Sequence, residues 1–329
     1  MFFLINFLDG TNPPLSFSDK NQKLKHGYLM QRRYFILAST AFLASAPLMQ
    51  DAWAATTDDL SLSSTRTGNK PPQVKSFEVK GVSIGKGVPK IIVPITAKTP
   101  NEALEKAKSL AQLKEVDMIE FRIDHQQGAL DKSAMTDLTC QLTDTLEDKP
   151  LLATFRTKAE GGEKAISNRD YAALNRALLD EGAIDLIDIE MMRDEALVRD
   201  LVQKAHDKNV IVIISNHNLH DTPPSAELIR RLRRQQALGA DILKMAVMPK
   251  DNSDTLRLMN ATWEMYSRYA ERPLLTMAMS EEGVLSRLSG ELTGSALTYG
   301  KSGVGSASGQ LEAKDLHTVL NIIHSANGA

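Results

Sequence analysis

One lysine stands in the middle of an apolar run, where a charged side chain is unusual. Lys244 lies within DILKMAV, residues 241–247. A lysine is almost never fully buried unless its charge is paired or used. Burial and neighbouring cations lower the pKa of an amine, and the neutral amine can attack a carbonyl carbon to form an imine. Lys244 is therefore a candidate nucleophile. The alternative is a packed side chain whose charge meets Glu120 or Glu160.

A histidine at the end of another apolar run complements this lysine. The run VIVIIS, residues 210–215, continues directly into Asn216 and His217. An imidazole exchanges protons near neutral pH, so it is a suitable base for removing a proton next to a carbonyl or an imine. Lys244 and His217 together predict carbonyl chemistry that begins with an imine.

Charged residues also alternate with apolar ones in DMIEFRIDH. Glu120, Arg122 and Asp124 fall on one face of the expected strand, and the apolar residues between them fall on the other. Charges that face a core are costly unless they are paired or used. We therefore interpret Glu120 and Arg122 as substrate-binding residues or as a structural ion pair.

Other charged residues follow neighbouring runs. Arg156 and Glu160 come at the end of the run 150–156 and in the loop after it, and Asp188 and Glu190 end the run 185–190, where we expect them to form hydrogen bonds at the rim. Arg287 follows a seventh run and is suited to hold a carboxylate with two parallel hydrogen bonds.

These residues are spaced along a regular alternation of short apolar runs and helical segments. Eight Val-, Ile- and Leu-rich runs alternate with longer segments of helical spacing, which predicts parallel strands buried on both faces. The runs are residues 90–96, 117–123, 150–156, 185–190, 210–215, 241–247, 273–279 and 294–299. The helical segments are residues 101–113, 132–146, 168–179, 195–208, 225–238, 253–269, 281–288 and 313–324.

Eight such repeats over about 250 residues predict an α/β fold, a single-domain (β/α)8 TIM barrel. The competing architecture is a doubly wound open sheet, which usually has a glycine-rich phosphate loop after its first strand. After Val93 of the first run the sequence reads PITAKTP, which contains no glycine. In a barrel the active site lies at the carboxyl ends of the strands, which is where the charged residues cluster.

Composition narrows the class of protein. The 329 residues are 42% hydrophobic and 24% charged, as in soluble globular proteins. A formal net charge of −2 gives no reason to expect nucleic acid or an anionic membrane as a partner. The single cysteine, Cys140, excludes a disulfide within the chain. His217 and His220 have the spacing of metal ligands but no evident third ligand, so we expect no metal.

The N-terminal region predicts export. Arg32 and Arg33 precede an uncharged stretch and then the small-residue site Ala52-Trp53-Ala54, which together indicate a signal peptide. We assign residues 1–55 to targeting, with Met30 as the expected functional start, residues 56–76 to a flexible linker, and residues 77–326 to the barrel. Both the general secretory and the twin-arginine routes fit, and either predicts a periplasmic protein without stable membrane insertion. A membrane anchor or signal at residues 1–8 is the alternative.

Six motifs resemble, in order, those of the type I 3-dehydroquinate dehydratases. They are EFRIDH, TFRTKAEGGE, SNH, the Lys244 strand with AVMP, TMAMSEEGVLSRLSGE and GSASGQ, and the resemblance covers about residues 75–325. It implies a cofactor-free conversion of 3-dehydroquinate to 3-dehydroshikimate through an imine on Lys244 and syn loss of water. It also implies a homodimer.

The resemblance assigns roles to individual residues. His217 is implied as the general base and acid, and Glu160 as the carboxylate that orients it. The implied substrate-binding residues are Glu120, Arg122, Arg156, Arg287, Ser306 and Gln310, the last two from a glycine- and serine-rich lid. Three positions depart from the family pattern and are expected to alter affinity or lid closure: Pro94, Leu219 and Ser308.

Export favours breakdown of quinate-like nutrients over cytoplasmic aromatic biosynthesis. Two other functions also fit part of this pattern. A class I aldolase also uses a lysine imine but usually binds phosphate near the last two strands. An exported binding protein would capture a hydroxylated ring acid without turnover, although every reacting group is retained in this sequence.

Overall fold

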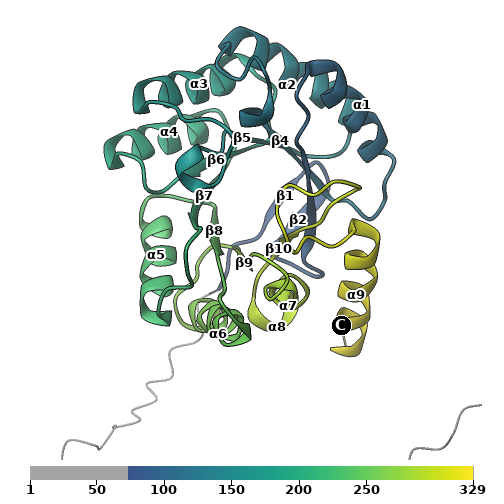
Figure 1. Ribbon diagram of the computed structural model, residues 1–329, viewed down its shortest axis with the longest axis vertical. Helices are drawn as coiled ribbons and strands as arrows, with labels where there is room; N and C mark the ends of the chain where they lie inside the picture. Colours follow the sequence, from purple (N-terminus) through teal and green to yellow (C-terminus); the bar gives the residue numbers. More distant parts are fainter. Residues whose placement is uncertain (1–72, 329) are drawn as a thin grey trace, which may run out of the picture. The chain divides into compact units, whose positions relative to one another are not determined.

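The computed structural model describes residues 73–328. Within them, eight parallel strands form one sheet that curls into a barrel, with the helices on its outer face (Figure 1). The sheet order is β10-β3-β4-β5-β6-β7-β8-β9, and a bridge between Leu274 and Ser295 joins the two ends. The strands are β3 Lys90–Ile95, β4 Met118–Arg122, β5 Leu151–Thr154, β6 Leu186–Glu190, β7 Ile211–Asn218, β8 Ile242–Val247, β9 Leu274–Ala278 and β10 Leu297–Tyr299.

Local signals in the sequence start several of the helices. Thr99 and Glu102 form a reciprocal capping box at α1, and the side chains of Ser167 and Asp251 accept backbone N–H groups at the starts of α3 and α6. The described helices are α1 Pro100–Ala111, α2 Lys132–Leu146, α3 Asn168–Glu181, α4 Glu195–Asp207, α5 Ser225–Ala237, α6 Asn252–Arg268, α7 Val284–Leu288, α8 Gly290–Thr293 and α9 Ala313–Ala326; short 3-10 turns follow β4 (Ile123–His125) and β5 (Lys158–Glu160).

Alternation along each strand divides the barrel interior into a lower apolar part and an upper polar part. Every strand contributes one buried apolar residue to an inner cluster near its amino end: Ile92, Met118, Leu152, Leu186, Ile213, Ile242, Leu275 and Leu297. Two residues later on the same strand face stand Glu120, Asp188 and Lys244. The sheet therefore aims its polar side chains into the carboxyl end of the barrel.

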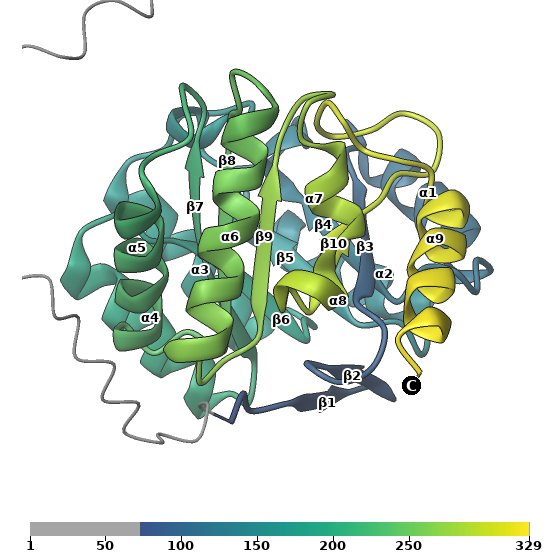
Figure 2. The same cartoon turned by 90° about the horizontal axis from the view of Figure 1, so that it is seen from below.

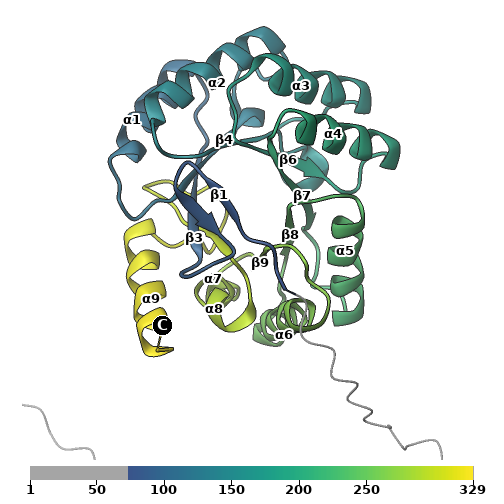
Figure 3. The same ribbon diagram turned by 180° about the vertical axis from the view of Figure 1, so that it is seen from behind.

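A two-stranded hairpin closes the opposite end of the barrel. β1 Phe77–Val79 pairs antiparallel with β2 Val82–Ile84, and the hairpin lies across the amino ends of the strands (Figures 2 and 3). Ile84 is fully buried and joins the inner apolar cluster. The hairpin thus keeps water from the bottom of the barrel.

The (β/α)8 prediction is confirmed, with local differences that include an additional short helix, α8. The hairpin was not predicted, because strands of three residues are too short to show alternation. The strand expected at residues 210–215 runs on to Asn218, because it pairs with β8 as far as Val247. The helix expected from residue 281 begins at Val284, with Gly283 as its N-cap, where a side chain would overlap the carbonyl groups of Ala278 and Met279.

The expected targeting segment, residues 1–55, lies outside the described residues, as do residues 56–72 of the expected linker. In the part of the chain that the structure describes, each helix falls short of the length and apolar character needed to cross a membrane.

Candidate active site

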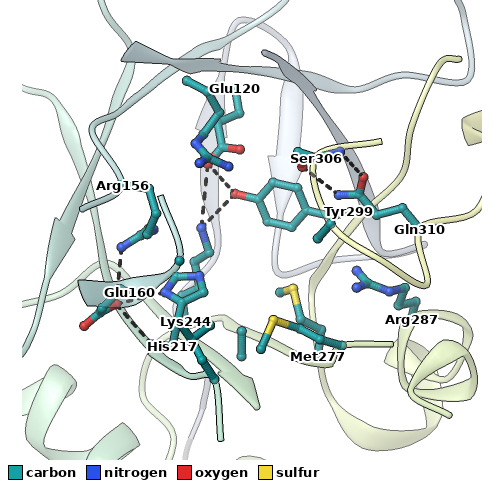
Figure 4. A pocket seen from close by; sticks show the side chains of 16 residues that line it. Glu120, Arg156, Glu160, His217, Lys244, Met277, Arg287, Tyr299, Ser306 and Gln310 are labelled. Atoms are coloured by element: carbon teal, nitrogen blue, oxygen red, sulfur yellow. Dashed lines mark hydrogen bonds and ion pairs between the residues drawn. The ribbon is translucent and has the colours of Figure 1, made fainter. Parts of the chain in front are cut away.

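All nine residues proposed from the sequence line one pocket at the carboxyl ends of the strands (Figure 4). The space is about 580 Å³ in volume, counting the part that is open to solvent. Strands β4, β7, β8, β9 and β10, the loop after β5, helix α7 and the loop after β10 each contribute at least one side chain to its wall.

The amine of Lys244 lies at the base of this pocket and is held by two groups. Its Nζ atom lies 2.9 Å from Asp188 Oδ2 and 2.9 Å from the hydroxyl of Tyr299. Glu120 Oε1 is farther away, at 3.7 Å. The residue is only 3% exposed, so the expectation of a buried amine holds. The expected carboxylate partners were Glu120 or Glu160, whereas the nearer partner is Asp188.

His217 and Glu160 form a pair beside the lysine. Glu160 Oε2 accepts the backbone N–H of His217 at 3.1 Å and lies 2.9 Å from Nδ1 of the same residue, which leaves Nε2 as the free ring nitrogen. Burial, together with the cations Arg156 and Lys244, lowers the pKa of His217 well below its usual value. The imidazole is therefore neutral at neutral pH and can accept a proton.

Burial also raises the pKa of Glu160 to about 7, and the carboxylates of Glu190 and Asp188 add to this rise against the opposing charge of Arg156. A carboxyl group that titrates near neutrality can stay hydrogen-bonded to the imidazole of His217 while that imidazole gains or loses a proton.

Arg156 is the centre of a carboxylate cluster. Its Nη1 atom contacts Glu190, Glu160 and Ser215, and Nη2 lies 2.7 Å from Asp188. These carboxylates hold the pKa of Arg156 well above its usual value despite burial. Since both terminal nitrogens already have partners, the guanidinium fixes the carboxylates beneath the pocket.

Arg122 is held by Asp124 through two parallel hydrogen bonds of 2.8 Å each. Asp124 also accepts the backbone N–H groups of Arg156 and Glu163, so it ties the end of β4 to the loop after β5. Glu120 accepts hydrogen bonds from Thr154 and from Tyr299, each at 2.9 Å. Arg122 and Glu120 are thus fixed before any ligand enters.

Arg287 differs from the other charged residues in the pocket because much of its guanidinium is unpaired. It is 1% exposed, and burial lowers its pKa to about 10, which still leaves it charged. Only Nη2 donates, to the Ser308 carbonyl at 3.3 Å, whereas Nε and Nη1 have no partner among residues 73–328. A buried cation with free donors is suited to bind an anion.

The loop after β10 covers one side of the pocket. Gln310 donates to Ser306 Oγ at 3.0 Å and accepts the Ser306 backbone N–H at 2.8 Å, so the two residues brace each other (Figure 4). Lys301 and Glu312 pair at the two ends of this loop. Of the three departures from the family pattern, Leu219 lines the pocket, Ser308 contacts Arg287, and Pro94 pairs in register with Glu120.

Two residues that contact the lysine received no role from the sequence. Asp188 was expected only at the rim, but it reaches the amine because its position on β6 faces inward, two residues after Leu186. The same alternation could have found it. Tyr299 ends a short apolar run and looks like a packing residue; only the pairing of β10 with β3, and of β3 with β4, places it near Glu120. Across residues 73–328, histidine, cysteine and acidic side chains form no cluster of three that could hold a metal ion.

Comparison with known proteins places this geometry among enzymes of one kind. Residues 91–327 match the family described as Type I 3-dehydroquinase. The chain is 44% identical over 253 residues to a protein of Salmonella agona (strain SL483) named 3-dehydroquinate dehydratase; the match spans 77% of this chain and all of that protein.

Solved structures give the same result. A type I 3-dehydroquinate dehydratase from Clostridium difficile, solved with covalently modified comenic acid, superposes with a TM-score of 0.74 at 43% identity, covering 77% of this chain and 99% of that one. A 3-dehydroquinate dehydratase from Enterococcus faecalis gives a TM-score of 0.71 at 40% identity, covering 75% and 98%.

Proposed function

This chain belongs to the type I 3-dehydroquinase family, and on that premise we propose that it dehydrates 3-dehydroquinate through a Schiff base on Lys244. Its activity is that of a 3-dehydroquinate dehydratase, which gives 3-dehydroshikimate and water. The Schiff base and the roles of the individual residues are the proposed part.

One observation carries the mechanism. A single pocket holds a buried lysine, a neutral histidine braced by a carboxylate, and a buried arginine with free donors. The lysine supplies a nucleophile for a ketone, the histidine a base for an adjacent proton, and the arginine a partner for a carboxylate. These three groups suit a hydroxylated keto acid, whose ketone forms the imine, whose neighbouring carbon loses the proton and whose hydroxyl leaves as water.

The substrate carboxylate would pair with Arg287, while Glu120, Arg122 and the lid residues Ser306 and Gln310 would meet the ring hydroxyls. The amine of Lys244 then attacks the C3 ketone, and loss of water leaves a protonated imine. This cation draws electrons from the neighbouring carbon, so the C2 proton becomes acidic enough for an imidazole to remove.

His217 would take the C2 proton and return a proton to the C1 hydroxyl as it leaves as water. Glu160 holds Nδ1, so Nε2 is the nitrogen free to exchange protons. An imidazolium forms between these two proton transfers, and the negative charge of Glu160 stabilises it. Hydrolysis of the imine releases the product and restores the amine.

Asp188 has a defined place in this scheme. Burial would raise its pKa, but the charges of Arg156 and Lys244 outweigh that effect and lower the pKa of Asp188 well below its usual range. The carboxylate therefore stays ionised beside Nζ, 2.9 Å away. It stabilises both the ammonium and the iminium, so the amine needs a separate route to lose its proton before it attacks.

Borohydride reduction in the presence of 3-dehydroquinate tests the Schiff base. The reduced adduct is expected on the peptide that contains Lys244, with loss of activity in step. Lys244→Met should give neither adduct nor turnover, whereas Lys250→Met, which alters a lysine at the end of the following loop, should behave like the parent. Turnover by Lys244→Met, or an adduct on another lysine, would exclude the mechanism.

The physiological setting is a second part of the proposal. We propose that the chain is exported to the periplasm and acts in the breakdown of quinate-like compounds, which rests on the signal-like residues 30–55 of the sequence. Cell fractionation should place the activity outside the cytoplasm; activity confined to the cytoplasm would contradict the export.

The family resemblance supports a homodimer, and light scattering would give twice the chain mass if the protein is one.

A further inference from the structure

The hydroxyl of Tyr299 occupies a specific place beside the proposed nucleophile. Tyr299 is the last residue of β10 and faces inward, and only 4% of its surface is exposed. Its hydroxyl lies 2.9 Å from Lys244 Nζ and 2.9 Å from Glu120 Oε1 (Figure 4). Lysine and glutamate are themselves 3.7 Å apart, so the phenol bridges a gap that is too long for a good hydrogen bond.

The direction of both hydrogen bonds follows from the donors available. A tyrosine hydroxyl has one proton, and an ionised carboxylate can only accept. Tyr299 therefore donates to Glu120 and accepts from the amine of Lys244. Burial raises the pKa of Tyr299 well above its usual value, and the charges of Glu120 and Asp188 raise it further, so the phenol keeps its proton.

The other neighbour of the amine is a poor route for its proton. Asp188 accepts hydrogen bonds from Arg156 and Ser215 at its second oxygen, and the two neighbouring cations favour its ionised form. Glu120 accepts no hydrogen bond from an arginine, although the charge of Arg122 acts on it: its hydrogen-bond partners within residues 73–328 are Thr154 and Tyr299. Glu120 is thus a carboxylate to which no arginine donates, and the amine reaches it through Tyr299.

We propose that Tyr299 is a catalytic residue whose hydroxyl relays a proton from the amine of Lys244 to Glu120 and so frees the amine to attack the substrate ketone. The inference deepens the proposed function and rests on it, since it requires Lys244 to be the nucleophile.

The relay conserves protons and charge. An N–H bond of Lys244 breaks as an O–H bond forms on Tyr299, and the original phenol proton moves to Glu120. The lysine is then a neutral amine and the glutamate a neutral acid. Nζ forms a bond to the ketone carbon as the carbonyl π bond opens, and one of the two remaining N–H protons of Lys244 moves to that oxygen to give a hydroxyl. The hydroxyl then takes the proton held by Glu120 and leaves as water, so the iminium keeps one N–H proton and Glu120 is ionised again.

Tyr299→Phe removes the relay and little else. The phenyl ring remains, and with it the packing and the contact between Nζ and the ring face, whose centre lies 4.8 Å from the amine. Rapid-quench trapping with borohydride, using the full chain and 3-dehydroquinate, measures the rate of imine formation directly. We expect this rate to fall at least about tenfold, in the range of proton-transfer catalysis by one group. The final amount of Lys244 adduct should not change.

Thr154→Val is the matched control. It removes the other hydrogen bond to Glu120 Oε1 and does not touch the lysine. A relay through Tyr299 predicts that this variant slows imine formation much less than Tyr299→Phe. If both variants slow it equally, the hydroxyl only positions Glu120, and the relay is excluded. Equal rates for Tyr299→Phe and the parent exclude it as well.

A measurement on the parent protein avoids dependence on the variant's folding. Two protons move together in the relay, so imine formation should be slower in heavy water, and Tyr299→Phe should lose most of this effect. The absence of a solvent isotope effect in the parent excludes the relay. Failure of the parent to give any Lys244 adduct would instead remove the proposed function, so the two failures are distinguishable.

Discussion

Two buried arginines of the pocket meet their surroundings in opposite ways. Arg156 contacts three carboxylates and a hydroxyl, so its charge is compensated inside the protein. Arg287 is as deeply buried, yet two of its nitrogens have no partner in the described chain. An uncompensated buried charge costs stability until a ligand supplies the opposite charge. We therefore expect Arg156 to contribute mainly to stability and Arg287 mainly to binding.

Replacing each arginine by methionine should separate these roles. Arg287→Met should stabilise the free protein by roughly 1–3 kcal/mol, because an unsatisfied buried group is removed. It should also raise the KM for 3-dehydroquinate roughly 100-fold, because the charge-assisted hydrogen bonds to the substrate carboxylate are lost. Arg156→Met should destabilise by roughly 3–5 kcal/mol, because it strands buried carboxylates. Thermal melts and steady-state kinetics check both. A destabilised Arg287→Met with normal KM would contradict the assignment.

The pair of Glu160 and His217 should set the acid limb of the pH profile. Glu160 must be ionised to hold the imidazole and favour its charged form, and its pKa is raised to about 7. We therefore expect kcat to rise with pH through about 7. Glu160→Gln should lose that limb and reach a plateau at least about tenfold lower, since the stabilising charge is gone. A limb that persists unchanged in this variant would show that another group titrates.

The same shift predicts a change in stability with pH. The pKa of Glu160 is higher in the folded state than the ordinary value of 4.5, so its contribution to stability is complete below 4.5 and is lost as pH rises through about 7. Glu160→Gln cannot ionise, so the difference in unfolding free energy, variant minus parent, should increase over this window. Denaturant unfolding at pH 5 and pH 8 measures it, and a constant difference would argue against a raised pKa.

At the scale of the element, the conformation of the lid after β10 depends on one glycine. Gly309 has φ +75°, and a side chain there would overlap the Ser280 carbonyl. Gly303, in the same loop, has φ +78° with open space around it. Gly309→Ala should displace the neighbouring Ser308 carbonyl from Arg287 and raise the KM several-fold. Gly303→Ala has the same backbone cost of roughly 1–2 kcal/mol and should leave the KM near that of the parent. Equal KM values for both variants would contradict this lid geometry.

How far the sequence predicts an element depends on its length and on what it contacts. The eight apolar runs predict the barrel and the charges at their ends predict the pocket, because alternation acts within one strand. Alternation within a strand does not predict the role of Tyr299, because its partner Glu120 is 179 residues away and only the order of the strands brings them together. The β1–β2 hairpin escapes for a different reason, since Phe77–Val79 and Val82–Ile84 are too short to show a period.

At the scale of the whole molecule, the pocket and the hairpin that closes the barrel lie at opposite ends of the strands. The pocket opens at the carboxyl ends of the strands, and the hairpin seals the amino ends (Figure 2). Between them lies the inner apolar cluster, to which every barrel strand contributes. Changes at the sealed end should therefore alter the free energy of unfolding without altering the chemistry.

Ile84 offers the sharpest test of this separation. It is the fully buried residue of the hairpin and packs into the inner cluster, so Ile84→Ala should lower stability by roughly 2–5 kcal/mol. Val82, on the same short strand, is only partly buried, and Val82→Ala should cost clearly less. Both variants should keep the parent kcat and KM at temperatures where they remain folded, because neither residue lines the pocket. A lower kcat for folded Ile84→Ala would mean that the seal at the bottom of the barrel also positions the lysine strand above it.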